Sequence, residues 1–279
     1  MPARVLAVVL LLGASWLSGC ASLGLQRGAS KPAEPQPAAL PQDPSRETNE
    51  PPDVALSIED DFVVRVVAGS VTCSGALIAP DRVLTAHHCV AARSPNGSIQ
   101  QHDLDASSLR VELGGGHLPW GEVGVRAIVA PRCGHVGGEG DVAVLVLERP
   151  VRGVAVRAPE LDQAPAEGAE LMAIGFGRCA ASGDGVYRKL RNGTPVTKVS
   201  SARFQLQAAI CPGDSGGPVV SLNTGRILGV VSRSVMDADE ATFGLTELTR
   251  LDAFRAVFAS AALVAEGASV AELPPVDCR

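Results

Sequence analysis

The chain has 279 residues, of which 46% are apolar, and this is enough for a sizeable core even without an N-terminal segment. Thirty glycines, twenty prolines and 3% aromatic residues favour many short elements joined by turns over long helices. A formal charge of -6 without a basic run argues against nucleic acid as a partner, because affinity for phosphates grows with the Lys and Arg that neutralise them.

The histidines show none of the local spacings of a metal site. Neither H-x-x-x-H nor H-x-H occurs, and no C-x-x-C lies nearby. We therefore expect no metal and no cofactor. The residues concerned are His87, His88, His102, His117 and His135.

The first residues are typical of an export signal, with Arg4, an apolar stretch at residues 5–12 and small residues before Cys20. The stretch is short for a membrane-spanning helix, which needs about 20 residues. The sequence LSGC at residues 17–20 resembles the bacterial lipobox, in which the cysteine is diacylated and becomes the first mature residue. The resemblance predicts a lipoprotein signal peptide at 1–19 and a membrane anchor at Cys20. Cleavage elsewhere, with Cys20 incidental, is the alternative.

Residue 21 is alanine rather than an acidic residue, which by the same resemblance favours the outer membrane of a Gram-negative cell, facing the periplasm or the outside. Residues 20–57 are proline-rich, polar and nearly free of large apolar side chains. Such a segment cannot bury enough surface to offset the entropy of ordering it. We expect a disordered tether that holds a folded domain away from the lipid.

Short β-branched runs separated by turn residues begin at residue 62 and continue to about residue 150. A second set of runs follows a connector at residues 158–168 and extends to about residue 232. One helix is predicted at 248–264, where Leu251, Phe254, Phe258 and Ala261 recur at three- and four-residue steps. The pattern predicts an all-β fold of two β units with a C-terminal helix.

Three separated segments contain the residue types needed for a serine nucleophile. They are CSGALIAPDRVLTAHHC at 73–89, GDVAVLVLERPV at 140–151 and CPGDSGGPVV at 211–220. A hydroxyl is a poor nucleophile at its ordinary pKa, so Ser215 would need an imidazole base. The base in turn needs a carboxylate that holds its tautomer and stabilises the imidazolium.

The three segments resemble the signatures of the chymotrypsin-like (trypsin-like) serine peptidases, in that family's order of His, Asp and Ser. The resemblance covers residues 62–261. It implies a peptidase domain at 58–262, built of two packed six-stranded antiparallel β-barrels at about 60–157 and 165–246. The helix at 248–264 and a tail at 263–279 complete the chain. The implied function is a serine endopeptidase acting on polypeptides through an acyl-enzyme, with a monomeric catalytic domain.

The resemblance assigns His88 as the general base, Asp141 as its partner and Ser215 as the nucleophile. The N–H groups of Gly213 and Ser215 would form the oxyanion hole. His87 departs from the family, which usually has alanine there, and we expect its side chain to point away from that of His88.

Asp214 resembles the residue that a buried cation neutralises to hold the serine loop in shape. Many members supply that cation as a new Ile/Val-Val-Gly-Gly N-terminus, and no such motif precedes residue 62 here. We therefore hypothesise that no zymogen cleavage is needed and that Arg178 or Lys198 meets Asp214.

The family's specificity pocket places Ala209, followed by Ile210, at the floor. Without an acidic floor, a preference for Arg or Lys is not expected. Ser232 resembles the residue that hydrogen-bonds the catalytic Asp, Ser234 lies on the pocket wall, and Gly244 would keep the pocket open. A small-to-medium apolar residue before the scissile bond is our prediction.

Seven cysteines are present, and the six after Cys20 suggest disulfides in an exported chain. The resemblance implies a Cys73–Cys89 bridge. Pairing by elimination gives Cys179–Cys211 and Cys133–Cys278, and the connectivity of these four stays open.

Two other interpretations compete with an active peptidase. The G-x-S-x-G sequence around Ser215 also fits the nucleophile elbow of α/β-hydrolases, but those enzymes place the catalytic histidine after the serine, and every histidine here precedes it. The second alternative is a catalytically idle peptidase-like domain that serves as a lipid-anchored binding or scaffold module. The presence of His88, Asp141, Gly213 and Ser215 favours the enzyme.

Overall fold

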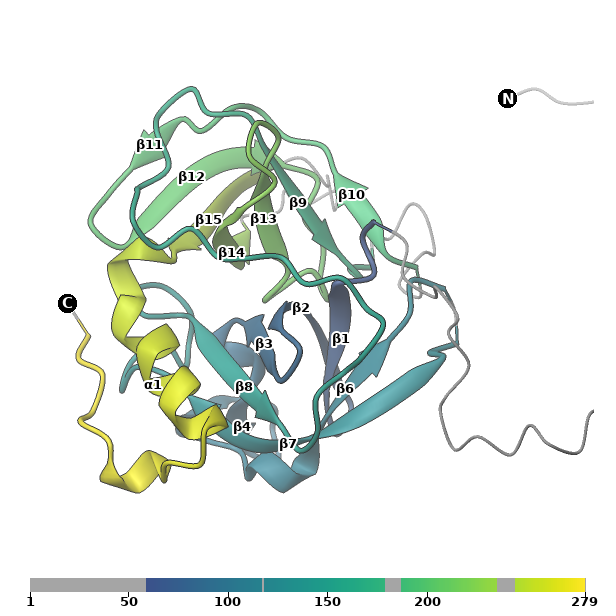
Figure 1. Ribbon diagram of the computed structural model, residues 1–279. Coiled ribbons are helices and arrows are strands. Elements are labelled where there is room, and N and C mark those ends of the chain that lie inside the picture. The colour runs from purple at the N-terminus through teal and green to yellow at the C-terminus, as the bar shows by residue number, and fades with distance from the viewer. Residues whose placement is uncertain (1–58, 117, 179–186, 235–243, 279) are drawn as a thin grey trace, which may run out of the picture. The chain divides into compact units, whose positions relative to one another are not determined.

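The computed structural model describes residues 59–116, 118–178, 187–234 and 244–278, all within the unit Pro52–Arg279 (Figure 1). The predicted signal peptide, Cys20 and the tether lie outside these residues, as do His117 and Cys179. Among the residues that are described, no helix is long and apolar enough to cross a membrane.

The first β unit is a closed six-stranded barrel, as predicted. All its strand pairs are antiparallel, and aliphatic side chains, mainly valine and leucine, fill its interior. In the order β1-β2-β3-β8-β7-β6, the strands are Val63–Ala68, Val71–Ala79, Arg82–Thr85, Ala143–Leu147, Gly121–Val129 and Leu109–Leu113.

Short elements complete this half of the molecule. The strands β4 (Ala91–Arg93) and β5 (Ile99–Asp103) form a separate two-stranded sheet. Two 3-10 helices follow β3 and β5, at His87–Cys89 (η1) and Ala106–Ser108 (η2). The helix η1 places two histidines immediately after the barrel strand β3.

The second β unit differs from the predicted closed barrel of six strands. In the described part of the chain it is a seven-stranded antiparallel sheet in the order β10-β9-β13-β14-β15-β12-β11. Its edge strands are only three and two residues long, and a single bridge from Gly193 to Ala208 links the chain after β10 to β12. In chain order, β9 to β15 are Leu171–Gly175, Lys189–Arg191, Lys198–Val199, Arg203–Ala208, Pro218–Ser221, Ile227–Ser234 and Gly244–Arg250.

The C-terminal helix begins later than predicted. Residues 248–250 belong to β15, where Leu248 pairs with Phe204 and Thr249 with Arg203. A 3-10 turn at Asp252–Phe254 (η3) precedes α1 (Arg255–Ala265), and another, η4 (Val270–Glu272), follows it. Sheet pairing therefore overrides the helical spacing at the start of the predicted segment.

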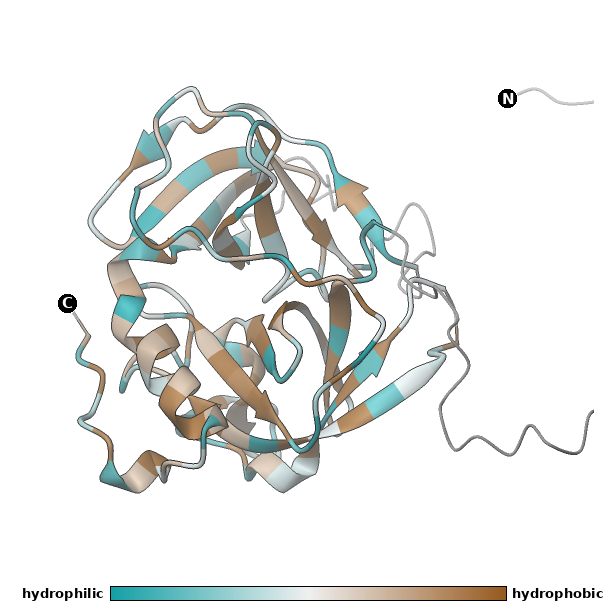
Figure 2. Cartoon of the chain, in the orientation of Figure 1, coloured by the Kyte–Doolittle hydropathy of each residue, from teal (hydrophilic) through white to brown (hydrophobic). Residues whose placement is uncertain are grey.

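Helix α1 packs against β8 and β7 of the barrel (Figure 1). Strand β8 is consequently buried on both faces, which explains why all five of its residues are apolar and inaccessible. The apolar core is continuous from the barrel to Ile174 in β9 and to Phe176 just after this strand. Figure 2 shows the hydrophobic residues that run along the barrel strands and α1. Strand β1 contacts β9 and β2 contacts β13. This packing brings the segments before β8, before β13 and after β3 to one region.

Candidate active site

His88 and Asp141 form a tight pair although 53 positions separate them. The Nδ1 of His88 lies 2.8 Å from Oδ2 of Asp141, and the His88 backbone N–H donates to Oδ1 at 2.9 Å. Asp141 is fully buried at the start of the segment that leads into β8, whereas the His88 side chain is 13% exposed. The two contacts fix both the position and the ring orientation of the imidazole.

Ser232 from β14 completes the surroundings of this carboxylate. Its hydroxyl donates to Oδ2 of Asp141 at 2.5 Å and accepts the Gly138 N–H at 3.3 Å. The carboxylate is therefore anchored from the barrel and from the seven-stranded sheet. The expected role of Ser232 matches this geometry.

The Ser215 loop is held by Ser74 of β2, a residue that the sequence analysis did not identify. The Ser74 N–H donates to the Ser215 carbonyl at 2.8 Å, and the Ser74 hydroxyl donates to the Gly213 carbonyl at 2.8 Å. A Cβ on Gly216, whose φ is 78°, would lie 2.4 Å from the Ser74 carbonyl oxygen. Only glycine fits this close approach of loop and barrel.

The two donors expected for an oxyanion hole are available to a ligand. Neither Gly213 N–H nor Ser215 N–H has a protein acceptor among the residues that the structure describes. By contrast, the Asp214 N–H donates to the Cys211 carbonyl and the Gly216 N–H to the Val231 carbonyl. The turn thus leaves free the two N–H groups that the chemistry requires.

Asp214 is fully buried and is neutralised by Arg191, which corrects the expectation of Arg178 or Lys198. The Arg191 Nε lies 2.9 Å from Oδ2 of Asp214, and its Nη2 donates to the Gly177 carbonyl at 2.7 Å. The side chain of Arg191 points inward at the end of β10, whereas Arg178 and Lys198 are exposed. Sequence alone contains no signal for this inward orientation.

The carboxylate of Asp214 also accepts two backbone donors, from Gly177 at 2.7 Å and from Cys211 at 2.9 Å. Burial raises the pKa of Asp214, and the Arg191 guanidinium and these N–H groups oppose that rise. The loop that contains Ser215 is therefore organised around an internal ion pair.

A cavity of about 270 Å³ opens beside Ser215. Ile210, Ser232 and Ser234 line it as predicted, but Ala209 and Gly244 do not. Instead, the Ala209 N–H donates a hydrogen bond to the Asn192 carbonyl, and Gly244, at the start of β15, pairs with Ala208 of β12. The other lining residues are Cys211, Pro212, Val231 and Arg233, of which Arg233 brings an exposed positive charge.

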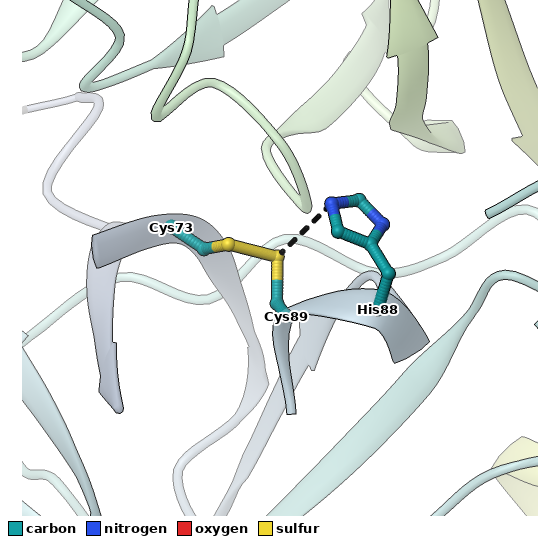
Figure 3. A group of neighbouring side chains, drawn as sticks. All are labelled: Cys73, His88 and Cys89. Atoms are coloured by element: carbon teal, nitrogen blue, oxygen red, sulfur yellow. Dashed lines mark hydrogen bonds between the residues drawn. A yellow bond between two sulfur atoms is a disulfide. The ribbon is translucent and has the colours of Figure 1, made fainter. Parts of the chain in front are cut away.

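No hydrogen bond joins His88 to the Ser215 hydroxyl in the described part of the chain. Instead, Nε2 of His88 lies 3.7 Å from Sγ of Cys89, beside the Cys73–Cys89 bridge (Figure 3). Hydrogen bonds between catalytic groups are often long in unliganded enzymes and shorten in the substrate complex. The structure therefore shows an oriented imidazole at His88 and an accessible loop at Ser215, but no hydrogen bond between the two side chains.

Two of the three predicted disulfides are present among the described residues. Bridges join Cys73 to Cys89 and Cys133 to Cys278, and Cys211 is also disulfide-bonded. Its predicted partner, Cys179, lies outside the described residues. The sulfurs near His88 are therefore not thiolates and do not offer a metal site.

His87 points away from the pair of His88 and Asp141, as expected. Its Nδ1 lies 2.5 Å from the Cys133 carbonyl oxygen and its Nε2 lies 2.7 Å from Oδ1 of Asp103. His135 approaches the same oxygen of Asp103 at 3.2 Å. The fold thus assembles two histidines and a carboxylate that show no metal-type spacing in the sequence.

Known proteins resemble this chain over most of the described residues. The family model described as Trypsin matches residues 41–255. A cercarial protease of Schistosoma mansoni is 28% identical over 207 residues, which cover 62% of this chain and 75% of the relative. A trypsin of Saccharopolyspora erythraea is 27% identical over 190 residues, covering 61% and 80%.

Solved structures share the fold at lower identity. Human heparin binding protein superposes with a TM-score of 0.57 at 20% identity, covering 78% of this chain and 94% of that protein. A Glu endopeptidase in complex with MPD gives a TM-score of 0.54 at 17% identity, covering 76% and 93%.

Proposed function

Because the chain belongs to the trypsin family, we propose that it is an active serine endopeptidase that uses Ser215, His88 and Asp141. The observation that carries the proposal is the paired contact of Asp141 with His88, at 2.8 and 2.9 Å, next to the region where the Ser215 loop meets β2. An oriented imidazole near a presented serine is the arrangement that acyl transfer needs.

In the proposed reaction, His88 Nε2 accepts the Ser215 proton while Oγ attacks the carbonyl carbon of the scissile peptide. The oxygen of the tetrahedral intermediate accepts hydrogen bonds from the N–H groups of Gly213 and Ser215. As the C–N bond breaks, His88 returns the proton to the leaving amine. Water then loses a proton to His88 and attacks the acyl carbon. As the bond from that carbon to the Ser215 oxygen breaks, His88 gives the proton to this oxygen, which regenerates Ser215 and releases the acid.

Hydrolysis of a denatured protein substrate by the purified full chain tests this function against the idle-module alternative. We expect new peptide termini with the native chain and none with Ser215→Ala. If circular dichroism shows that the native chain is folded, and it still yields no more products than Ser215→Ala, the domain is a binding or scaffold module.

The ion pair between Arg191 and Asp214 supports an enzyme that needs no activating cleavage. An internal guanidinium pairs with Asp214, which resembles the residue that meets a new N-terminal ammonium in many family members. We expect fully active enzyme to retain its chain upstream of Asp60 and Asp61. N-terminal sequencing of the active species checks this, and a new terminus at either residue would contradict it.

The lining of the cavity supports cleavage after a small-to-medium apolar residue. Ile210, Pro212 and Val231 provide apolar surface, and Arg233 disfavours a positively charged substrate side chain. In a peptide library we expect few cuts after Arg or Lys. Arg233→Gln should raise the kcat/KM for those peptides by roughly threefold to tenfold and leave apolar ones unchanged.

The matched control is Arg152→Gln, which removes an exposed arginine that does not line the cavity. An equal gain in both variants would show a general charge effect and refute the role of Arg233.

Lipid anchoring at Cys20 stays a proposal, as do the envelope location, the tether and the monomeric state. The LSGC sequence at 17–20 supports lipidation. Metabolic labelling with a radioactive fatty acid should mark the native chain and not Cys20→Ser, which should fractionate with soluble proteins.

A further inference from the structure

Outside the catalytic residues, two imidazoles and one carboxylate converge from three separate segments. His87 lies in η1, Asp103 ends β5, and His135 lies in the loop between Cys133 and Asp141. Both Nε2 atoms approach the same oxygen, Oδ1 of Asp103, at 2.7 and 3.2 Å. All three ligand atoms lie within 4.8 Å of one another.

The hydrogen bonding of His87 leaves its Nε2 without a proton of its own. A backbone carbonyl can only accept, so the contact of His87 Nδ1 with the Cys133 oxygen, at 2.5 Å, places the ring proton on Nδ1. The lone pair of Nε2 then faces Oδ1 of Asp103, 2.7 Å away, and a carboxylate oxygen is an acceptor too. Two acceptors this close require either an additional proton or a cation between them.

Metal-binding histidines typically donate the N–H of the other ring nitrogen to a backbone carbonyl or carboxylate, because this fixes the tautomer and directs the remaining lone pair to the ion. Zinc binds such nitrogen and oxygen atoms at about 2.0–2.2 Å in tetrahedral geometry. To accommodate the ion, the distance between Nε2 of His87 and the carboxylate oxygen of Asp103 would have to increase by about 0.7 Å. Asp103 is the mobile partner for this adjustment, because its side chain is 35% exposed whereas that of His87 is 1% exposed.

We propose that His87, Asp103 and His135 bind a divalent transition metal ion, with Zn²⁺ the best match to two imidazoles and one carboxylate. Donors of this kind favour zinc over Mg²⁺ and Ca²⁺, which prefer oxygen alone. The exposed side of Asp103 leaves a fourth position open to water or to a ligand.

The ion would connect two segments that contain catalytic residues. His87 immediately precedes His88, and His135 lies in the glycine-rich loop that leads to Asp141. A shared ion would limit the movement of that loop, in which Gly134, Gly137 and Gly140 all have positive φ. This consequence for the reaction rests on the proposed peptidase function, whereas metal binding does not.

Titration of Zn²⁺ into the full chain tests the site without reference to proteolysis. The protein contains Ser215→Ala to prevent self-digestion and is stripped with a chelator. By calorimetry we expect one equivalent to bind, and by thermal unfolding we expect Zn²⁺ to raise the Tm. His135→Gln and Asp103→Asn should each weaken binding at least tenfold and remove the Tm shift.

His102→Gln is the matched control, because it removes an exposed imidazole from the same strand, next to Asp103. It should bind Zn²⁺ as tightly as the parent. Three results would overturn the proposal: no Zn²⁺ uptake, undiminished uptake by both His135→Gln and Asp103→Asn, or an equal loss in His102→Gln. The first would mean that a proton alone bridges His87 and Asp103. Whether the native chain cleaves a protein substrate is a separate result, and neither outcome of that assay decides whether Zn²⁺ binds.

Discussion

Replacing Ser215 with alanine should lower kcat for peptide hydrolysis by about five to six orders of magnitude, and His88→Ala should cost about as much. In the proposed mechanism Ser215 supplies the attacking oxygen, and without His88 no base accepts its proton. The two losses should not multiply in the double variant, because both remove the same step. Single-turnover rates on a chromogenic peptide measure all three.

Asp141→Asn should lower kcat by about 10⁴-fold, because an amide in place of the carboxylate no longer holds the Nδ1 proton in the required tautomer. The two carboxylate oxygens accept three donors, the His88 backbone N–H on Oδ1 and the His88 ring N–H and Ser232 hydroxyl on Oδ2, so an asparagine would set its NH2 group against at least one donor. Ser234→Ala is the control, since it alters the cavity without touching the reacting groups. Comparable losses in Ser234→Ala and Asp141→Asn, or a Ser215→Ala variant that still turns over, would refute this assignment.

Replacing Arg191 with leucine should reduce the free energy of unfolding by about 3–5 kcal/mol, because it leaves the buried carboxylate of Asp214 without its cation. The same carboxylate accepts the N–H groups of Gly177 and Cys211, which shape the serine loop. Misplaced oxyanion donors should lower kcat by a further 10²–10³-fold. Urea unfolding at pH 7 and steady-state kinetics measure the two effects.

The loss in free energy of unfolding that Arg191→Leu causes, relative to the native chain, should become smaller as the pH falls from 7 towards 4. A carboxyl group whose pKa is higher in the folded than in the unfolded chain binds protons preferentially when folded, so acid favours the folded state through that group. Burial already raises the pKa of Asp214, and removing Arg191 takes away the largest opposing influence. The other carboxylates contribute equally to the free energy of unfolding of the variant and of the native chain, so their contributions cancel when the two are subtracted at each pH.

Arg203→Leu is the matched control on the same sheet. Its partner, Glu247, lies 2.9 Å away, but both side chains are partly exposed, at 29% and 22%. Such pairs contribute about 1 kcal/mol or less. If Arg191→Leu is no less stable than Arg203→Leu and retains full activity, the internal ion pair does not organise the serine loop.

The residues that could be predicted are those set by short local patterns. His88, Asp141 and Ser215 each lie in a contiguous segment that resembles a family signature. The β-branched runs with turn residues predicted two β units, and the family resemblance implied that the first is a closed barrel. The contact between His88 and Asp141 follows from strand order, because β3 and β8 are neighbours in the barrel.

Residues whose role depends on side-chain direction or long-range approach could not be predicted. Arg191, Arg178 and Lys198 are equally plausible as cations in the sequence, and only the inward orientation at the end of β10 selects Arg191. Asp103 and His135 meet His87 through loop packing that no spacing rule describes. The helix boundary was wrong because Leu248 and Thr249 gain strand partners on two sides.

Mass-spectrometric mapping of a fluorophosphonate adduct tests most directly whether His88 activates Ser215. The folded native chain should carry the label on the peptide that contains Ser215, and His88→Ala should remain folded but unlabelled. Absence of the adduct from the folded native chain, or equal labelling of His88→Ala, would contradict the catalytic assignment.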